Sequence, residues 1–151
     1  MFWQRGLWLV AALWWGSMTA LGAWVVPLLF AHAPTKAVAA GLAVHLFSAQ
    51  AWVALVCGLL SLWAQRHMDR VRGRAHVPSA LILAAMLMAA IGEWGVAPRI
   101  VARENMLLWH SLGTAFWVLQ WGCLTAHVWR LSRHALNAPW PMADSAEMPK
   151  S

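Results

Sequence analysis

The sequence predicts an all-α integral membrane protein built as a four-helix bundle. The chain of 151 residues is 62% hydrophobic and only 11% charged, with a mean hydropathy of +0.58. About a quarter of the residues of a soluble domain are charged, so this is not a soluble composition. Four long stretches carry no formal charge or a single one. Each can cross a bilayer core of about 30 Å, which takes about 20 helical residues.

The four predicted spans cover residues 7–31, 37–64, 77–98 and 106–129. We expect helices because a backbone in lipid must satisfy its own hydrogen bonds, and the alternating pattern of a barrel strand does not occur. The first span exceeds the roughly 7 to 15 residues of a signal-peptide core, so we expect it to be retained. Residues 1–134 thus form the predicted transmembrane domain, and residues 135–151 a short flexible cytoplasmic tail.

Basic side chains beside the spans predict the orientation. With four spans, both termini and the middle loop share one side, which holds Arg5, Arg66, Arg70, Arg72, Arg74, Arg130 and Arg133. The other side holds Lys36, Arg99 and Arg103. Because lysine and arginine concentrate in cytoplasmic loops, we expect both termini in the cytoplasm. This placement also explains the net charge of +6 without nucleic acid as a partner.

Ionisable residues inside the spans are the most informative positions, because each costs about 2.5–3.5 kcal/mol at the bilayer centre unless it is paired or hydrated. Glu93 lies in the third span, His110 in the fourth and His45 in the second. From the helical rise they lie about 7, 6 and 12 Å below the same outer boundary. The sequence therefore predicts a polar membrane site near the outer face, formed by Glu93, His110 and His45.

Small residues indicate which way these three side chains point, because transmembrane helices approach closely where side chains are small. Such residues share a helical stripe with each ionisable residue: Ala85 and Ala89 precede Glu93 by eight and four positions, Gly41 and Ala49 flank His45 at four, and Gly113 and Thr114 follow His110 at three and four. We therefore expect all three to face the bundle interior. The first span has a similar stripe, Ala12, Gly16 and Ala20. Pro27 is predicted to kink that helix toward the same layer.

Three interpretations of the polar site remain open. A carboxylate beside an imidazole can hold a proton, a cation or the polar end of a substrate. Glu93 and His110 can instead form a structural pair that locks the third span to the fourth. His45 and His110 can also face each other across the bundle as the two axial ligands of a haem.

The remaining polar residues point to packing rather than to catalysis. We expect Gln50 and Gln120 to hydrogen-bond across helices, and Cys57 and Cys123 to be buried as small hydrophobes. Nucleophile elbows, phosphate loops and metalloprotease motifs do not occur in the sequence. We therefore predict neither an enzyme nor a cofactor.

Five short motifs follow one another along the chain: LWWGS at residues 13–17, PLLF at 27–30, LVCG at 55–58, GEWG at 92–95 with Pro98, and LWHS at 108–111. In this order they resemble the bacterial proteins similar to transmembrane protein 205, which are small four-span proteins classed as a domain of unknown function. The resemblance covers roughly residues 5–131 and implies a bacterial inner-membrane protein. It directs attention to Pro27, Glu93 and His110, and it supplies no substrate.

Three classes of function follow from these observations. We expect a carrier or channel for a small ion or solute, linked to protons through Glu93 and His110, because buried charge in membranes often marks a pathway. An accessory protein that binds other membrane proteins is the alternative, and a haem or metal protein is the third. The expected partners are the lipid bilayer and either a second copy or another membrane protein, but no nucleic acid.

Overall fold

The fold is known from a computed structural model, which describes residues 2–71, 73 and 79–136. The described part is helical and contains no strand. Most of the predicted tail, the residues from 137 onward, lies outside it, and so do Arg72 and Arg74 of the predicted orientation signal.

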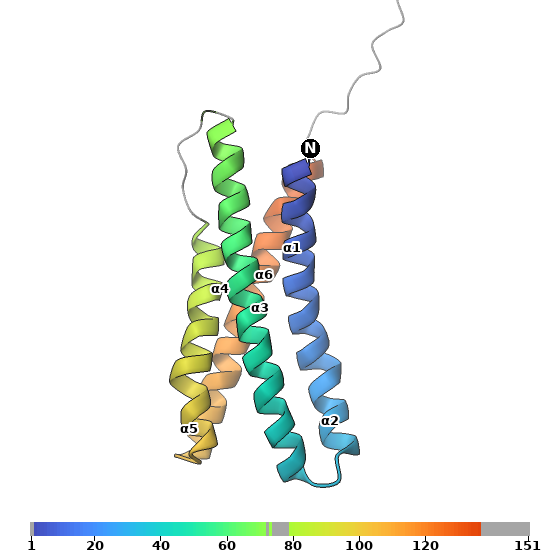
Figure 1. The fold of residues 1–151 in the computed structure, drawn as a ribbon, viewed down its shortest axis with the longest axis vertical. Coiled ribbons are helices and arrows are strands. Elements are labelled where there is room, and N and C mark those ends of the chain that lie inside the picture. The colour runs from blue at the N-terminus through green and yellow to red at the C-terminus, as the bar shows by residue number, and fades with distance from the viewer. Residues whose placement is uncertain (1, 72, 74–78, 137–151) are drawn as a thin grey trace, which may run out of the picture.

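Four helical rods make up the structure (Figure 1). The first consists of α1 (Phe2–Ala20), the π-helical segment η1 (Leu21–Val25) and α2 (Val26–His32). The second is α3 (Lys36–Val71). The third consists of α4 (Ala80–Ala90), the π-helical segment η2 (Ile91–Val96) and α5 (Ala97–Val101). The fourth is α6 (Met106–Leu136).

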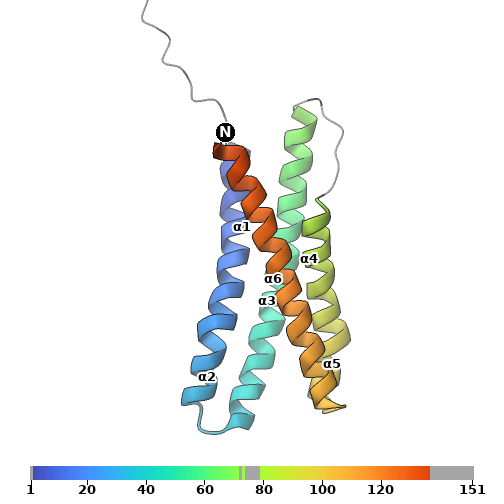
Figure 2. The same cartoon turned by 180° about the vertical axis from the view of Figure 1, so that it is seen from behind.

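The rods run up and down and close into a ring. α1 packs against α3 and α6, and α4 packs against the same two helices. Seen from behind, α6 crosses the bundle at an angle, from α5 at one end to α1 at the other (Figure 2). The N-terminal end of α1 lies beside the C-terminal end of α6, so the first and the last described helix have these ends on the same side of the bundle (Figure 1).

The rods agree closely with the predicted spans. Three of them, Trp3–His32, Lys36–Val71 and Ala80–Val101, are long and apolar enough to cross a membrane. The fourth begins at Met106 as predicted and extends to Leu136, past the predicted end of the span at residue 129 and of the domain at residue 134. The described chain is therefore all-helical, with three candidate membrane spans.

A proline follows each π-helical segment. Pro27 is the second residue of α2, and Pro98 is the second residue of α5. Proline has no N–H, and its ring clashes with the carbonyl four residues earlier. The residue before each proline bonds instead to the carbonyl five residues back, Val26 to Leu21 and Ala97 to Gly92. At Pro27, where a kink is predicted, the helix thus widens. The sequence did not indicate η2, although π-helical turns often occur at functional sites.

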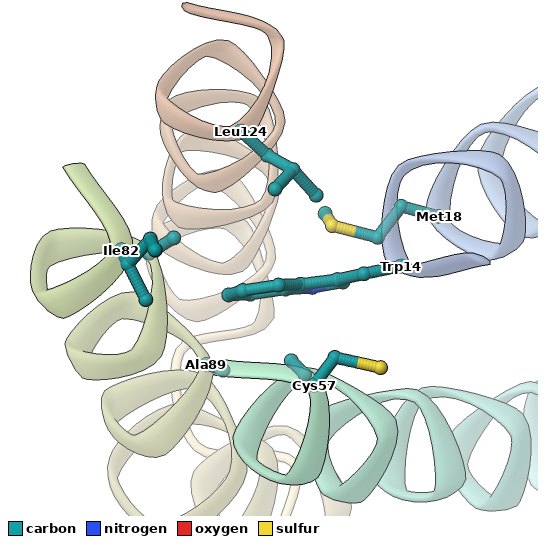
Figure 3. Packing of buried hydrophobic residues seen from close by; sticks show 8 residues of the cluster. Trp14, Met18, Cys57, Ile82, Ala89 and Leu124 are labelled. Carbon is teal, nitrogen blue, oxygen red and sulfur yellow. The ribbon is translucent and has the colours of Figure 1, made fainter. Parts of the chain in front are cut away.

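Trp14 forms the centre of the core and is fully buried. Its indole extends from α1 across the bundle, with Met18 and Leu124 on one side and Cys57 and Ala89 on the other (Figure 3). Ile82 of α4 lies beyond the far end of the ring (Figure 3). All four rods therefore meet at one side chain.

Two tryptophans and two threonines join α1 to α6 in a reciprocal arrangement. Trp15 Nε1 donates to Thr125 Oγ1 at 2.9 Å, and Trp121 Nε1 donates to Thr19 Oγ1 at 3.0 Å. The two indoles stack with their centroids 6.2 Å apart. We call these four residues the Trp–Thr clasp. It satisfies both indole N–H groups between helices, which matters where the surroundings offer no water.

Gly58 of α3 packs tightly against Met86 of α4, and this packing predicts the effect of a small substitution. A Cβ atom at Gly58 would lie 2.4 Å from Met86 Sδ and 2.5 Å from its Cγ, so Met86 would have to move. We expect Gly58→Ala to lower the free energy of unfolding by about 1–3 kcal/mol, measured by thermal unfolding in detergent.

The matched control for Gly58→Ala is Gly16→Ala, because a Cβ at Gly16 meets no atom within 4 Å. It should change stability by no more than about 0.5 kcal/mol. Adding Met86→Ala to Gly58→Ala should recover part of the loss. Equal stability of the two glycine variants would contradict the proposed close packing.

Candidate functional site

The candidate site centres on Glu93, which lies in η2 and is half-buried. Ser48 of α3 donates a hydrogen bond from its Oγ to Glu93 Oε1 at 2.6 Å. This length is typical of an O–H···O⁻ bond, which is roughly twice as strong as a neutral one. The carboxylate of the third rod is therefore held by the second rod, and not by the fourth as the sequence suggested. We call this pair the Ser48–Glu93 seam.

Glu93 has no basic partner in the described part of the chain. Among the residues that the structure describes, no lysine, arginine or histidine forms an ion pair with it. The nearest arginine along its own rod, Arg99, is engaged elsewhere: its guanidinium lies over the Trp109 ring, 4.5 Å from the centroid, and it donates to the carbonyl of Gly95. Among the described residues, the Ser48 hydroxyl is therefore the one group that stabilises the Glu93 carboxylate by a hydrogen bond.

Aromatic rings cover the outer side of the Ser48–Glu93 seam. Trp52, one helical turn after Ser48, meets Trp94, the neighbour of Glu93, edge to face with centroids 6.0 Å apart. Both rings are exposed on the surface of the bundle. The carboxylate therefore lies beside a surface that would face lipid in a membrane, which raises the cost of leaving it charged.

A second polar contact lies two residues from Ser48 along α3. Gln50 is buried and donates from Nε2 to Ser17 Oγ of α1 at 3.0 Å, and Ser17 donates in turn to the carbonyl of Trp14 at 2.9 Å. The predicted role of Gln50 in joining helices is confirmed. Gln120 is buried too, one turn from Leu124 of the core. The interior of the bundle thus holds buried polar side chains close to the Trp14 core.

His45 lies on the side of α3 that carries the seam. It stands three residues before Ser48, and residues three apart on a helix share a face. Its side chain is exposed, and Gly41 and Ala49 are exposed as well. The expectation that this stripe faces the interior is therefore wrong. The interior face of α3 is instead formed by other residues: Ala39, Ala43, Gln50, Ala54 and Cys57.

His110 lies on the exposed surface of α6. It is exposed and opens into a shallow groove of about 630 Å³ along one face of α6, which His110, Ser111, Thr114, Ala115, Val118 and Leu119 line. The Ser111 and Thr114 hydroxyls donate to carbonyls of their own helix. No hydrogen bond or ion pair joins His110 to Glu93 within the described ranges. The expected direct contact between these two residues is thus not formed.

The haem interpretation needs His45 and His110 to face each other across the interior, and both side chains are exposed. This geometry is therefore not formed. The described residues also contain no group of three His, Cys, Asp or Glu side chains placed to hold a metal ion. Cys57 is buried and Cys123 half-buried, and both are free thiols.

Sequence reasoning missed Ser48. A serine in an apolar run ordinarily bonds to its own helix, as Ser111 does here. The only signal was its place between His45 and Gln50, which puts three polar residues within six positions of an otherwise apolar stretch. That cluster marks the part of α3 that meets Glu93.

These features define an all-helical membrane protein with a lone carboxylate in one of its candidate spans. Residues 9–106, more than half of the chain, match the family described as a domain of unknown function (DUF4149), and the chain belongs to this family. No curated protein and no solved structure matches it. The matched segment holds His45, Ser48 and Glu93, whereas His110 lies beyond it.

Proposed function

We propose that the protein is a proton-linked carrier or channel for a small ion or solute, in which Glu93 takes up and releases the proton or cation. One observation carries this proposal: Glu93 lies within an apolar rod, accepts a hydrogen bond from a single hydroxyl and has no cationic partner among the described residues. A carboxylate kept only for structure would be expected to have a basic partner, because an uncompensated charge is costly in a membrane.

The path to Glu93 runs along α3. His45 is exposed one turn from Ser48, toward the end of the bundle where α2 meets α3. An imidazole has one nitrogen that donates a proton and one that accepts it, so we assign His45 the transfer of protons between the surface and the Ser48–Glu93 seam. His110 opens onto the far groove, so we assign it no part in this path.

We infer that α6 is the fourth span and that both termini are cytoplasmic, in a bacterial inner membrane. The length of α6 and its packing against α1 and α4 support this arrangement. The described basic residues at the end that holds the α1 N-terminus support the orientation: Arg5, Arg66, Arg70, Arg130 and Arg133. The similarity to transmembrane protein 205, which rests on the five short motifs, belongs to this proposal. A bundle this small is expected to form its pathway as an oligomer.

An accessory role is the second candidate, and the groove along α6 favours it. An open groove of about 630 Å³ with small residues at its floor suits a helix of another membrane protein. A photoreactive amino acid at Ala115 would then cross-link to one partner at fixed stoichiometry. Cross-linking to lipid alone would contradict this role.

The test of the transport proposal is proton flux. The purified protein in liposomes with an internal pH dye, driven by a potassium diffusion potential, is expected to move protons. Glu93→Gln should reduce the rate at least about tenfold, which corresponds to about 1.4 kcal/mol on the barrier. The matched control is Glu104→Gln, because Glu104 is an exposed acid in the loop before α6.

Two histidine variants distinguish the contributions of His45 and His110 to proton flux. His45→Ala should slow proton flux, and His110→Ala should leave it unchanged. Wild-type flux in Glu93→Gln, with the protein folded and inserted, would contradict the proposal.

A further inference from the structure

A second groove lies between α1 and α3, at the end of the bundle that holds the α1 N-terminus. It measures about 170 Å³, and Gly6, Leu7, Val10, Leu60, Trp63 and Ala64 are among the residues that line it. It also reaches Trp3, so it extends over seven residues of α1, or about 10 Å along the helix. A narrow apolar groove that runs parallel to membrane-spanning helices has the shape and the chemistry of an acyl chain.

Gly6 keeps this groove open. A Cβ atom at this position would meet no other atom within 4 Å, so the space beside Gly6 is free. The first carbon of a larger side chain at this position would therefore enter open space. A substitution at Gly6 therefore tests the groove separately from the stability of the fold.

Aromatic rings lie at the mouth of the groove. Trp3 meets Trp63 edge to face, with centroids 4.8 Å apart, and its ring lies 4.4 Å from that of His67. Tryptophan concentrates where the hydrocarbon core of a membrane gives way to the headgroups. The groove thus opens at the depth where the glycerol backbone of a phospholipid would lie.

Two arginines continue the face of α3 that carries Trp63. Arg66 comes three residues after Trp63 and Arg70 seven residues after it, which places both on the Trp63 face, about 4.5 and 10.5 Å farther along the axis. Both side chains are exposed, and so is Arg5 beside Gly6. Asp69, three residues after Arg66, lies on the same side of α3 and has interactions of its own. The mouth therefore carries positive charge beyond an apolar interior.

We propose that this groove binds one acyl chain of an anionic phospholipid, with its phosphate held by Arg66 and Arg70. The apolar walls account for the chain, the Trp3–Trp63 pair for the glycerol region, and the arginines for the preference for negative charge. The proposal is independent of transport through Glu93, because the two sites share no residue.

The experiment measures retained lipid. The full chain in nanodiscs of equal phosphatidylglycerol and phosphatidylcholine is released into the gas phase, and bound lipids are counted by native mass spectrometry. We expect the wild type to retain phosphatidylglycerol at least about fivefold over phosphatidylcholine. Gly6→Leu should reduce the total retained lipid severalfold, and Arg66→Gln with Arg70→Gln should abolish the preference for phosphatidylglycerol.

The controls apply the same changes elsewhere on the chain. Gly122→Leu adds a side chain at another open and exposed glycine, and Lys36→Gln removes a charge at the opposite end. Both should retain phosphatidylglycerol as the wild type does. Equal retention in Gly6→Leu and Gly122→Leu, or no preference between the two lipids in the wild type, would overturn the proposal.

A measurement on the wild type keeps the proposal testable if Gly6→Leu fails to fold. Phosphatidylglycerol with a photoreactive group in the acyl chain should cross-link mainly to residues of the groove, such as Val10 and Leu60. Cross-links spread evenly around the bundle would show an ordinary lipid annulus and would overturn the proposal.

Discussion

Replacing Trp14 by alanine is expected to lower the free energy of unfolding by about 3–5 kcal/mol. In a membrane the loss comes from packing rather than from transfer out of water, because the separated helices remain in lipid. Trp14 is fully buried and contacts residues from all four rods, so its removal leaves a cavity that no single helix can close. Unfolding by a denaturing detergent, followed by circular dichroism, would measure the loss.

Two further variants show that the Trp14 effect comes from its place in the core. Trp24→Ala removes an exposed indole from the same rod and should cost less than about 0.5 kcal/mol. Trp14→Phe should cost much less than Trp14→Ala, because Trp14 Nε1 has no hydrogen-bond partner among the described residues. A loss below about 1 kcal/mol in Trp14→Ala would contradict the central role of this side chain.

Replacing Ser48 by valine is expected to reduce proton flux about 10- to 100-fold while Glu93 stays in place. The Ser48 hydroxyl is the single described donor to this carboxylate, at 2.6 Å, and a hydrogen bond to a charged group is worth about 1.5–3 kcal/mol. Without it the charged form of Glu93 loses its partner. Flux in liposomes measures the rate, and the carboxyl infrared band, assigned by its loss in Glu93→Gln, reports directly on the proton.

The conservative variant and a matched control complete the Ser48 test. Ser48→Thr keeps the hydroxyl and should retain most of the flux. Ser111→Val removes a serine that donates only to the carbonyl of its own helix and should leave flux and infrared band unchanged. If Ser48→Val left the Glu93 band unaltered, the hydrogen bond would have no part in the chemistry.

Much of the fold could be predicted from the sequence, because charge-free runs and prolines mark where helices can begin and end. The rods match the predicted spans, and α6 begins at the predicted residue Met106. The η2 segment could not be predicted. Its widening depends on how Pro98 and its neighbours share carbonyl groups, and the same proline could equally produce a kink.

The sequence predicted less well which side chains face the interior of the bundle, because small residues are common in this chain. Alanine occurs on more than one face of α3, so a stripe of small residues does not distinguish the interior from the surface. On α4 the rule succeeds, since Ala85 and Ala89 are buried on the side of Glu93. On α1 it fails at Ala12, which is exposed while Ala11 is buried. The partner of Glu93 depends on the register between two helices, which hydrophobicity does not encode.

The Trp–Thr clasp restricts how the molecule can move. It ties α1 to α6 at two points one helical turn apart, on the side of η1 nearer to the chain ends. If the two rods separate without breaking these bonds, they must pivot about the clasp, and the displacement then grows toward α2 and the N-terminal end of α6. The widened turn η1 lies in one of these arms, and η2, which carries Glu93, packs against the other. The clasp thus acts as the pivot of a hinge, and Glu93 lies on a rod that contacts one of its arms.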